Sequence, residues 1–114
     1  MIVEDDPLIR QLYKEVFISE GHVVVGEAAD GEEALKLFHS LQEKPDLIVL
    51  DYRMPKKNGL EVAQEIMEST PNAKILMISG DPTINQNIVL SCDIKFARKP
   101  VQMIELLKII SMEI

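Results

Sequence analysis

LIVLD at residues 47–51 joins four consecutive apolar residues to a carboxylate, and ILMI at residues 75–78 is a second unbroken apolar run. Unbroken runs, in contrast to alternating ones, are typical of strands that are buried on both faces. Such strands occur almost only in parallel sheets that carry helices on each side. The centre of the chain therefore predicts an α/β protein built on a parallel sheet.

Short apolar runs with β-forming residues extend this pattern toward both ends of the chain. The five predicted strands are Met1–Val3, Val23–Val25, Leu47–Leu50, Ile75–Ile78 and Ile94–Ala97. Segments with helical spacing separate them, so we expect five strands to alternate with five helices, with right-handed crossovers placing helices on both faces. The predicted fold class is a doubly wound, five-stranded parallel α/β sheet. The 114 residues fit one domain, residues 1–114, with a few native residues expected upstream because the chain begins inside its first strand.

Aspartates mark the expected starts of three helices, because aspartate accepts hydrogen bonds from the free N–H groups of a first turn. These starts are Asp6 before Pro7, Asp30 three residues before Glu33, and Asp81 before Pro82. The segment from Asp81 to Asp93 predicts a short or irregular fourth helix.

Two of the expected helices show an apolar face that could cover the sheet. The first predicted face consists of Leu8, Leu12 and Val16, and the second of Ala34, Leu37, Phe38 and Leu41.

The overall charge argues against some classes of partner. A formal net charge of −7 opposes general binding to nucleic acid or to an anionic membrane, since both rely on clustered Lys and Arg. No apolar run is long enough to cross a bilayer. Cys92 is the only cysteine, so no internal disulfide is possible and we expect a cytoplasmic protein.

Polar residues follow the predicted strands, and all strands of an open parallel sheet end at the same edge, where ligands bind. We therefore expect acids, a hydroxyl and an amine to converge there. They are Glu4, Asp5 and Asp6 after the first strand, Asp51 after the third, Ser79 after the fourth and Lys99 after the fifth.

Clustered carboxylates need a compensating charge. Two of them about 4 Å apart repel by roughly 4 kcal/mol at an effective dielectric near 20. Carboxylate oxygens without a His or Cys cluster select a hard cation, and Mg²⁺ fits best because it leaves room for water and phosphate oxygens. Lys99 can contact phosphate as a point charge, and Ser79 can donate a hydrogen bond to it. The set predicts phosphoryl-transfer chemistry.

In this order, the motifs resemble the receiver domain of response regulators along essentially the whole chain. They are Val3-Glu4-Asp5-Asp6, Leu50-Asp51-Tyr52-Arg53-Met54-Pro55, Asn58-Gly59, Ile78-Ser79-Gly80 and Lys99-Pro100. The resemblance implies the flavodoxin-like (βα)5 fold, with strand order 2-1-3-4-5.

The resemblance also implies a role for each site residue, with Mg²⁺ as the cofactor. Asp51 is the expected phosphoacceptor. The expected metal-site residues are Asp5 as a direct ligand, Glu4 as the acid that holds metal-bound water, Asp51, and Arg53 through its backbone carbonyl. Ser79 and Lys99 are expected to contact the phosphoryl group, and Ser79 and Phe96 to form the switch.

A receiver domain would take its phosphoryl group from a sensor histidine kinase or a phosphotransfer protein. It would catalyse its own phosphorylation and slow dephosphorylation. A homodimer or an effector would bind the surface formed by the fourth helix, fifth strand and fifth helix. From Val101 to Ile114 the last helix carries more apolar residues than one sheet-facing stripe uses.

The residues leave three alternatives open. An Asp-nucleophile phosphohydrolase would also use Mg²⁺, a lysine and a hydroxyl, although such enzymes place a second Asp where Arg53 stands. The chain could also be an interaction module that is not phosphorylated, although Asp5, Asp51 and Lys99 are all present. A flavodoxin-like cofactor binder would need a glycine- and hydroxyl-rich loop where three acids stand. The sequence names neither the kinase nor the output, and does not distinguish a stand-alone receiver from part of a longer regulator.

Overall fold

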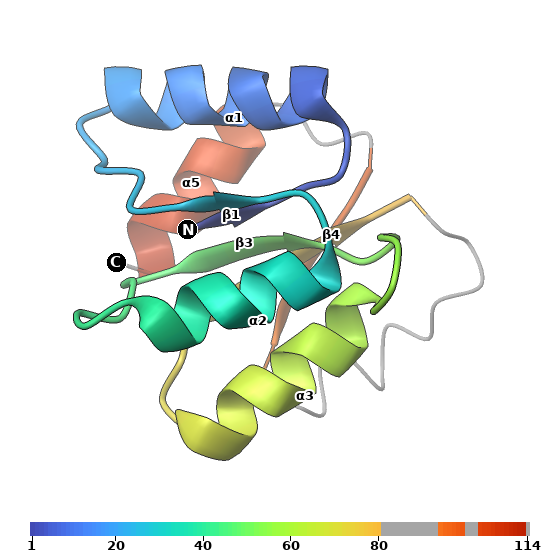
Figure 1. Ribbon diagram of the computed structural model, residues 1–114. Helices are drawn as coiled ribbons and strands as arrows, with labels where there is room; N and C mark the ends of the chain where they lie inside the picture. The colour runs from blue at the N-terminus through green and yellow to red at the C-terminus, as the bar shows by residue number, and fades with distance from the viewer. Residues whose placement is uncertain (81–93, 100–102, 114) are drawn as a thin grey trace.

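The computed structural model describes residues 1–80, 94–99 and 103–113, which form one sheet with helices on both faces (Figure 1). All five strands are parallel, in the spatial order β2-β1-β3-β4-β5. Their bounds are β1 Ile2–Val3, β2 Glu27–Ala28, β3 Ile48–Asp51, β4 Ile75–Ser79 and β5 Lys95–Arg98. The helices within the described residues are α1 Pro7–Ser19, α2 Gly31–Ser40, α3 Gly59–Ser69 and α5 Met103–Glu113. The expected fold class and strand order are confirmed.

The sheet separates two hydrophobic cores, because successive side chains of a strand point to opposite faces. Helices α1 and α5 cover one face and α2 and α3 cover the other (Figure 1). Every residue of β3 and β4 is buried, as the unbroken apolar runs predicted. The central strands therefore hold their carboxyl ends in fixed positions between two packed layers.

The predicted strand Val23–Val25 is wrong. The second strand begins later, at Glu27, and pairs with β1 so that Ile2 lies opposite Glu27. This register places Gly26 level with Met1, and Val23–Val25 precede the paired residues Glu27 and Ala28. Val23 is 82% exposed, whereas Val24 packs against the core beneath α1 and α5.

The predicted buried face of the first helix is also wrong. Leu8 is 81% exposed and Leu12 is exposed, whereas Tyr13 and Phe17 form the buried face and stack with ring centroids 6.0 Å apart. Apolar residues occur on two sides of α1, and the larger aromatic pair removes more apolar surface from water. In α2 the expected face is confirmed, with Ala34, Leu37, Phe38 and Leu41 in or against the core.

The helix starts agree with the capping signals where these are described. Asp6 accepts hydrogen bonds from the backbone of Leu8 and Ile9, and Asp30 accepts one from Glu33. A full capping box, which the sequence interpretation missed, joins Asn58 and Glu61 at the start of α3. The expected fourth helix and its Asp81–Pro82 start lie outside the described residues. None of the helices in the described part of the chain is long and apolar enough to span a membrane.

Candidate functional site

The carboxyl ends of β1, β3 and β5 bring two acids and an amine together. Glu4, Asp51 and Lys99 each stand two residues after a residue of the core beneath α1 and α5, so the alternation of side chains directs all three to that face. The Nζ atom of Lys99 lies 3.2 Å from Oε1 of Glu4 and 3.3 Å from Oδ1 of Asp51. The convergence expected from the strand ends is therefore present for these three residues, whereas Asp6 caps α1.

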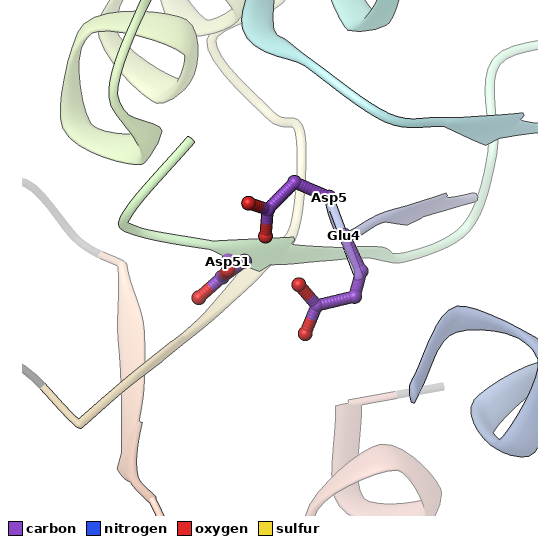
Figure 2. A group of neighbouring side chains, drawn as sticks. All are labelled: Glu4, Asp5 and Asp51. Carbon is purple, nitrogen blue, oxygen red and sulfur yellow. The ribbon is translucent and has the colours of Figure 1, made fainter. Parts of the chain in front are cut away.

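Three carboxylates meet at this point. Glu4, Asp5 and Asp51 each present an oxygen, and these oxygens lie within 4.8 Å of one another. Figure 2 shows the three side chains turned toward a common space, with Glu4 and Asp5 coming from the end of β1 and Asp51 from β3. Glu4 is 1% exposed and Asp51 is 7% exposed, whereas Asp5 is exposed. The arrangement combines buried negative charge with one side open to solvent.

Burial and crowding make these acids hard to ionise together. The pKa of Glu4 is raised from 4.5 to about 7, first because burial penalises its charge and then because Asp51 and Asp5 lie beside it. Burial also raises the pKa of Asp51, although a hydrogen bond from Glu4 and the charge of Lys99 oppose that effect. A proton that Glu4 shares with Asp51 explains why this hydrogen bond raises the pKa of Glu4 and lowers that of Asp51.

Lys99 partly compensates this negative charge. Burial lowers the pKa of its ammonium group, but the neighbouring carboxylates of Asp51 and Glu4 outweigh burial, so the pKa is raised overall. One positive charge thus lies among three carboxylates, leaving an excess of negative charge. A hard divalent cation would relieve that excess, and the all-oxygen donor set suits Mg²⁺.

The loop after β3 is held close to Asp51 by a glycine. The N–H group of Gly59 donates a 2.6 Å hydrogen bond to the carbonyl of Tyr52. A Cβ atom on Gly59 would lie 2.5 Å from the backbone oxygen of Asp51, which is closer than side-chain carbons approach. Lys56, in the same loop, has a positive φ of 72°. These features explain why the Asn58-Gly59 motif follows the acid at this spacing.

The remaining predicted site residues lie around this centre. Ser79 is buried at the end of β4, and its carbonyl accepts a 2.9 Å hydrogen bond from the N–H group of Lys99. Arg53 is exposed in the loop two residues after Asp51. Phe96 is half-buried against the core beneath α2 and α3, on the opposite face from Lys99, with the Arg98 guanidinium 5.3 Å from its ring centroid. The roles of Ser79, Arg53 and Phe96 remain predictions.

One residue at this centre was missed by sequence reasoning. Arg10 of α1 reaches back toward β1, and its Nη1 atom donates a 2.8 Å hydrogen bond to the backbone oxygen of Glu4. The available signal was an arginine one helical turn after the acid cluster. A single sequence does not distinguish such a residue from an ordinary solvated one.

Comparison with known proteins agrees with this geometry. The family model of the response regulator receiver domain matches residues 1–111. The chain belongs to this family. Within it, the curated chemotaxis protein CheY of Thermotoga maritima is 39% identical over 80 residues, which cover 70% of this chain and 65% of that protein. The transcriptional regulatory protein PdtaR of Mycobacterium tuberculosis is 44% identical over 66 residues, which cover 58% of this chain and 31% of PdtaR. The matches thus span less than two thirds of these relatives.

Solved structures of receiver domains extend the similarity to nearly the whole chain. The CheX–CheY complex of Borrelia burgdorferi with BeF₃ and Mg²⁺ contains a chain with a TM-score of 0.88 and 30% identity, covering 99% of this chain and 87% of that one. The response regulator TrrA of Thermotoga maritima, in complex with Mg²⁺ and BeF, has a TM-score of 0.87 and 34% identity, covering 99% and 96%. This receiver domain is therefore part of two-component signalling.

Proposed function

We propose that this receiver domain accepts a phosphoryl group on Asp51 in a Mg²⁺-dependent reaction and thereby switches an interaction surface. The observation that carries the proposal is the Asp51 carboxylate itself. It is buried at the end of a central strand, beside two further acids and 3.3 Å from the Lys99 ammonium group. A buried carboxylate with a raised pKa and specific charged neighbours is typical of a functional site.

In the proposed transfer, an oxygen of Asp51 forms a bond to phosphorus as the phosphorus–nitrogen bond of a donor phosphohistidine breaks. The freed imidazole nitrogen keeps the bonding electron pair and takes up a proton. Lys99 leaves its position between Glu4 and Asp51 and binds a phosphoryl oxygen, where it stabilises negative charge. The hydroxyl group of Ser79 donates a hydrogen bond to another of these oxygens.

Glu4, Asp5 and Asp51 would hold the metal ion, together with the backbone carbonyl of Arg53. Bound Mg²⁺ would neutralise charge on the phosphoryl oxygens. In a separate hydrolysis step, water attacks phosphorus, the bond between phosphorus and the Asp51 oxygen breaks, and phosphate is released with Asp51 again a free carboxylate, so the domain would dephosphorylate slowly by itself. A phosphohydrolase is less well supported, because the residue two positions after Asp51 is Arg53 in place of a second acid.

The phosphodonor in this proposal is a sensor histidine kinase or a phosphotransfer protein of the cytoplasm. The output is a homodimer or an effector bound to the surface that includes β5 and α5. On α5, Ile104 is 66% exposed and Met112 is 86% exposed, while Leu106 and Ile110 are buried against the sheet. Apolar side chains are thus left on the outer side of this helix, where a partner could cover them.

The switch would connect the phosphorylation site at Asp51 with the surface that includes β5 and α5. Movement of Ser79 toward the phosphoryl group would open space into which Phe96 turns, so a local change of charge would bias a packing equilibrium. Sedimentation and chemical-shift mapping with and without Mg²⁺ and beryllofluoride would test this part. Unperturbed resonances at Phe96 and α5, together with unaltered self-association, would argue against it.

The phosphoacceptor itself is tested by incubating the protein with acetyl phosphate and measuring intact mass. We expect one phosphoryl group per chain with Mg²⁺, none after chelation, and none in Asp51→Asn. Asp6→Asn is the matched control, because asparagine can keep the helix cap while removing a neighbouring charge. Labelling of Asp51→Asn to the level of the unaltered protein would show that the acceptor lies elsewhere.

A further inference from the structure

Hydrogen bonds hold the backbone of Glu4 at both its N–H group and its carbonyl oxygen. Its N–H group donates a 3.1 Å hydrogen bond to the carbonyl of Ala28 in β2, as expected for a parallel ladder. Its carbonyl oxygen accepts a 2.8 Å hydrogen bond from Nη1 of Arg10, a side chain of α1. This carbonyl belongs to the peptide bond that joins Glu4 to Asp5, so Arg10 acts at the exact link between two of the three clustered acids.

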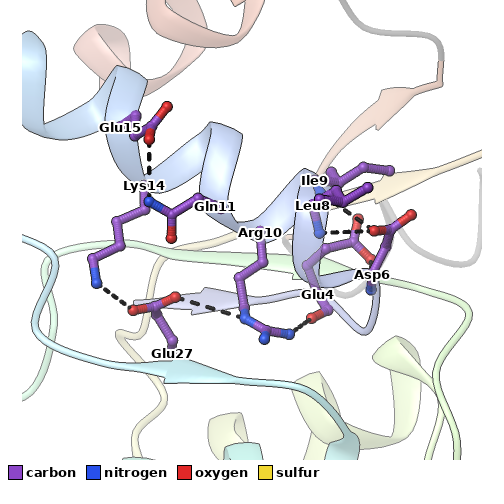
Figure 3. Close-up of polar contacts among 9 residues, drawn as sticks. All are labelled: Glu4, Asp6, Leu8, Ile9, Arg10, Gln11, Lys14, Glu15 and Glu27. Carbon is purple, nitrogen blue, oxygen red and sulfur yellow. Dashed lines mark hydrogen bonds and ion pairs between the residues drawn. The ribbon is translucent and has the colours of Figure 1, made fainter.

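Arg10 is in turn oriented by an acid of the neighbouring strand. Its Nε atom lies 3.6 Å from Oε1 of Glu27, whose other oxygen, Oε2, lies 2.9 Å from Nζ of Lys14. Glu27 directly precedes Ala28, the residue that binds the N–H group of Glu4. The contacts therefore close a ring through α1, β1 and β2, as Figure 3 shows for the side chains of Arg10, Glu27 and Lys14. A guanidinium group suits this place because its fixed fork of donors serves two acceptors at once.

This ring of contacts lies directly beside the acid cluster, because Arg10 binds the carbonyl between Glu4 and Asp5. Beyond β1 the chain leaves the ladder and turns into α1, so the repulsion between the Asp5 and Asp51 carboxylates pushes the turn away from Asp51. The hydrogen bond from Arg10 opposes that movement by tying the turn to the first helix. We propose that Arg10, oriented by Glu27, is a positioning residue that keeps Glu4 and Asp5 facing Asp51. The inference rests on the Mg²⁺ site of the proposed function.

A simple effect of charge would have the opposite sign. A guanidinium group near a cation site repels the cation, so its removal would strengthen Mg²⁺ binding if Arg10 acted only as a positive charge. If Arg10 positions the acids, its removal weakens Mg²⁺ binding even though a repulsive charge is lost. The direction of the change in affinity therefore separates the two roles.

The test is a Mg²⁺ titration of the folded protein, followed by calorimetry or by NMR shifts. We expect Arg10→Ala to weaken binding by about tenfold and Glu27→Gln by about threefold, as for other residues that orient metal ligands. The double variant should bind no more weakly than Arg10→Ala, because both changes break the same ring. Lys14→Ala is the matched control: it removes a positive charge and a Glu27 contact one turn further along α1, yet touches no acid of the cluster. Its affinity should stay within about twofold of the unaltered protein.

Equal affinities of Arg10→Ala and Lys14→Ala, or tighter binding by Arg10→Ala, would overturn the inference. A lower melting temperature of Arg10→Ala with unaltered Mg²⁺ affinity would also overturn it, since that result describes a structural residue only.

Should Arg10→Ala fail to fold, Arg10→Lys decides, because lysine keeps the positive charge but loses the forked set of donors. Weaker Mg²⁺ binding by Arg10→Lys supports the inference, and unaltered binding rejects it. If the unaltered protein binds no Mg²⁺, the proposed function fails with the inference. If Asp51→Asn abolishes binding while Arg10→Ala has no effect, the inference alone fails.

Discussion

Lys57 and Lys99 both form ion pairs with glutamate, but in different surroundings. Lys57 lies in the loop before α3, and its Nζ atom is 2.8 Å and 2.9 Å from the two oxygens of Glu65 in that helix. Lys99 lies at the carboxyl edge of the sheet, 3.2 Å from Glu4 and 3.3 Å from Asp51. The shorter contacts belong to the pair whose acid is half-exposed, with 42% of the Glu65 side chain open to water and salt that screen its charge. The longer contacts belong to Lys99, whose two partner acids are buried. We therefore expect burial, more than contact distance, to decide which lysine contributes more to stability.

The largest effect is expected where the two regions join. Gly59 begins α3 and packs against the backbone of Asp51, where an added Cβ atom would meet that backbone oxygen at 2.5 Å. We expect Gly59→Ala to lower the free energy of unfolding by about 2–3 kcal/mol, because two backbone segments must separate. It should also weaken Mg²⁺ binding, since Asp51 belongs to the displaced segment. Chemical denaturation and Mg²⁺ titration measure the two effects.

Gly21→Ala is the control for Gly59→Ala. Gly21 has a φ of +89° and nothing within 4 Å of an added Cβ atom, so the change should cost about 1 kcal/mol through backbone strain alone. Mg²⁺ affinity should stay unaltered in this variant. Equal losses of stability in the two variants would show that the close packing at Gly59 contributes little.

The lysines themselves provide a direct comparison. Lys99→Ala leaves two buried acids without their cation, so we expect the free energy of unfolding near pH 7.5 to fall by about 1–3 kcal/mol without Mg²⁺. Lys57→Ala should lower it much less, because its partner Glu65 is half-exposed and keeps access to water. Urea denaturation of both variants measures the contrast. A larger loss for Lys57→Ala would mean that contact distance outweighs burial.

A smaller effect concerns pH. The pKa of Glu4 is raised from 4.5 to about 7 by burial and by Asp51, so the folded state binds a proton more tightly than the unfolded state. The stability that this proton contributes is present below pH 4.5 and is lost as pH rises through about 7. We expect Mg²⁺-free Glu4→Gln to lose less stability than the unaltered protein across this window. Thermal unfolding at several pH values would show it, and parallel profiles of the two proteins would contradict it.

The sequence was most informative where a feature depends only on residue type and on position along a strand. Apolar runs at β3 and β4 indicated a parallel sheet, and the acid that ends β3 indicated the site. Strand order followed from family resemblance, since periodicity does not say which strands are neighbours. Three acids and an amine converged as expected because parallel strands share one carboxyl edge; they are Glu4, Asp5, Asp51 and Lys99.

Errors arose where several arrangements satisfy the same pattern. The apolar residues of α1 lie on two sides, and only packing selected Tyr13 and Phe17 over Leu8 and Leu12. The position of β2 depended on its register with β1, which a run of three valines does not reveal. Arg10 was missed because its partner at the acid cluster is a backbone carbonyl, and backbone positions exist only in the folded chain.

A crystal structure with Mg²⁺ and beryllofluoride would test the central claim most directly, because beryllofluoride mimics a phosphoryl group bonded to a carboxylate. We expect beryllium on an Asp51 oxygen, Mg²⁺ in contact with Asp5 and Asp51, and Lys99 moved from Glu4 to a fluorine atom. Beryllofluoride bound to another carboxylate, or Mg²⁺ bound away from the three clustered acids, would contradict the proposal that Asp51 is the phosphoacceptor.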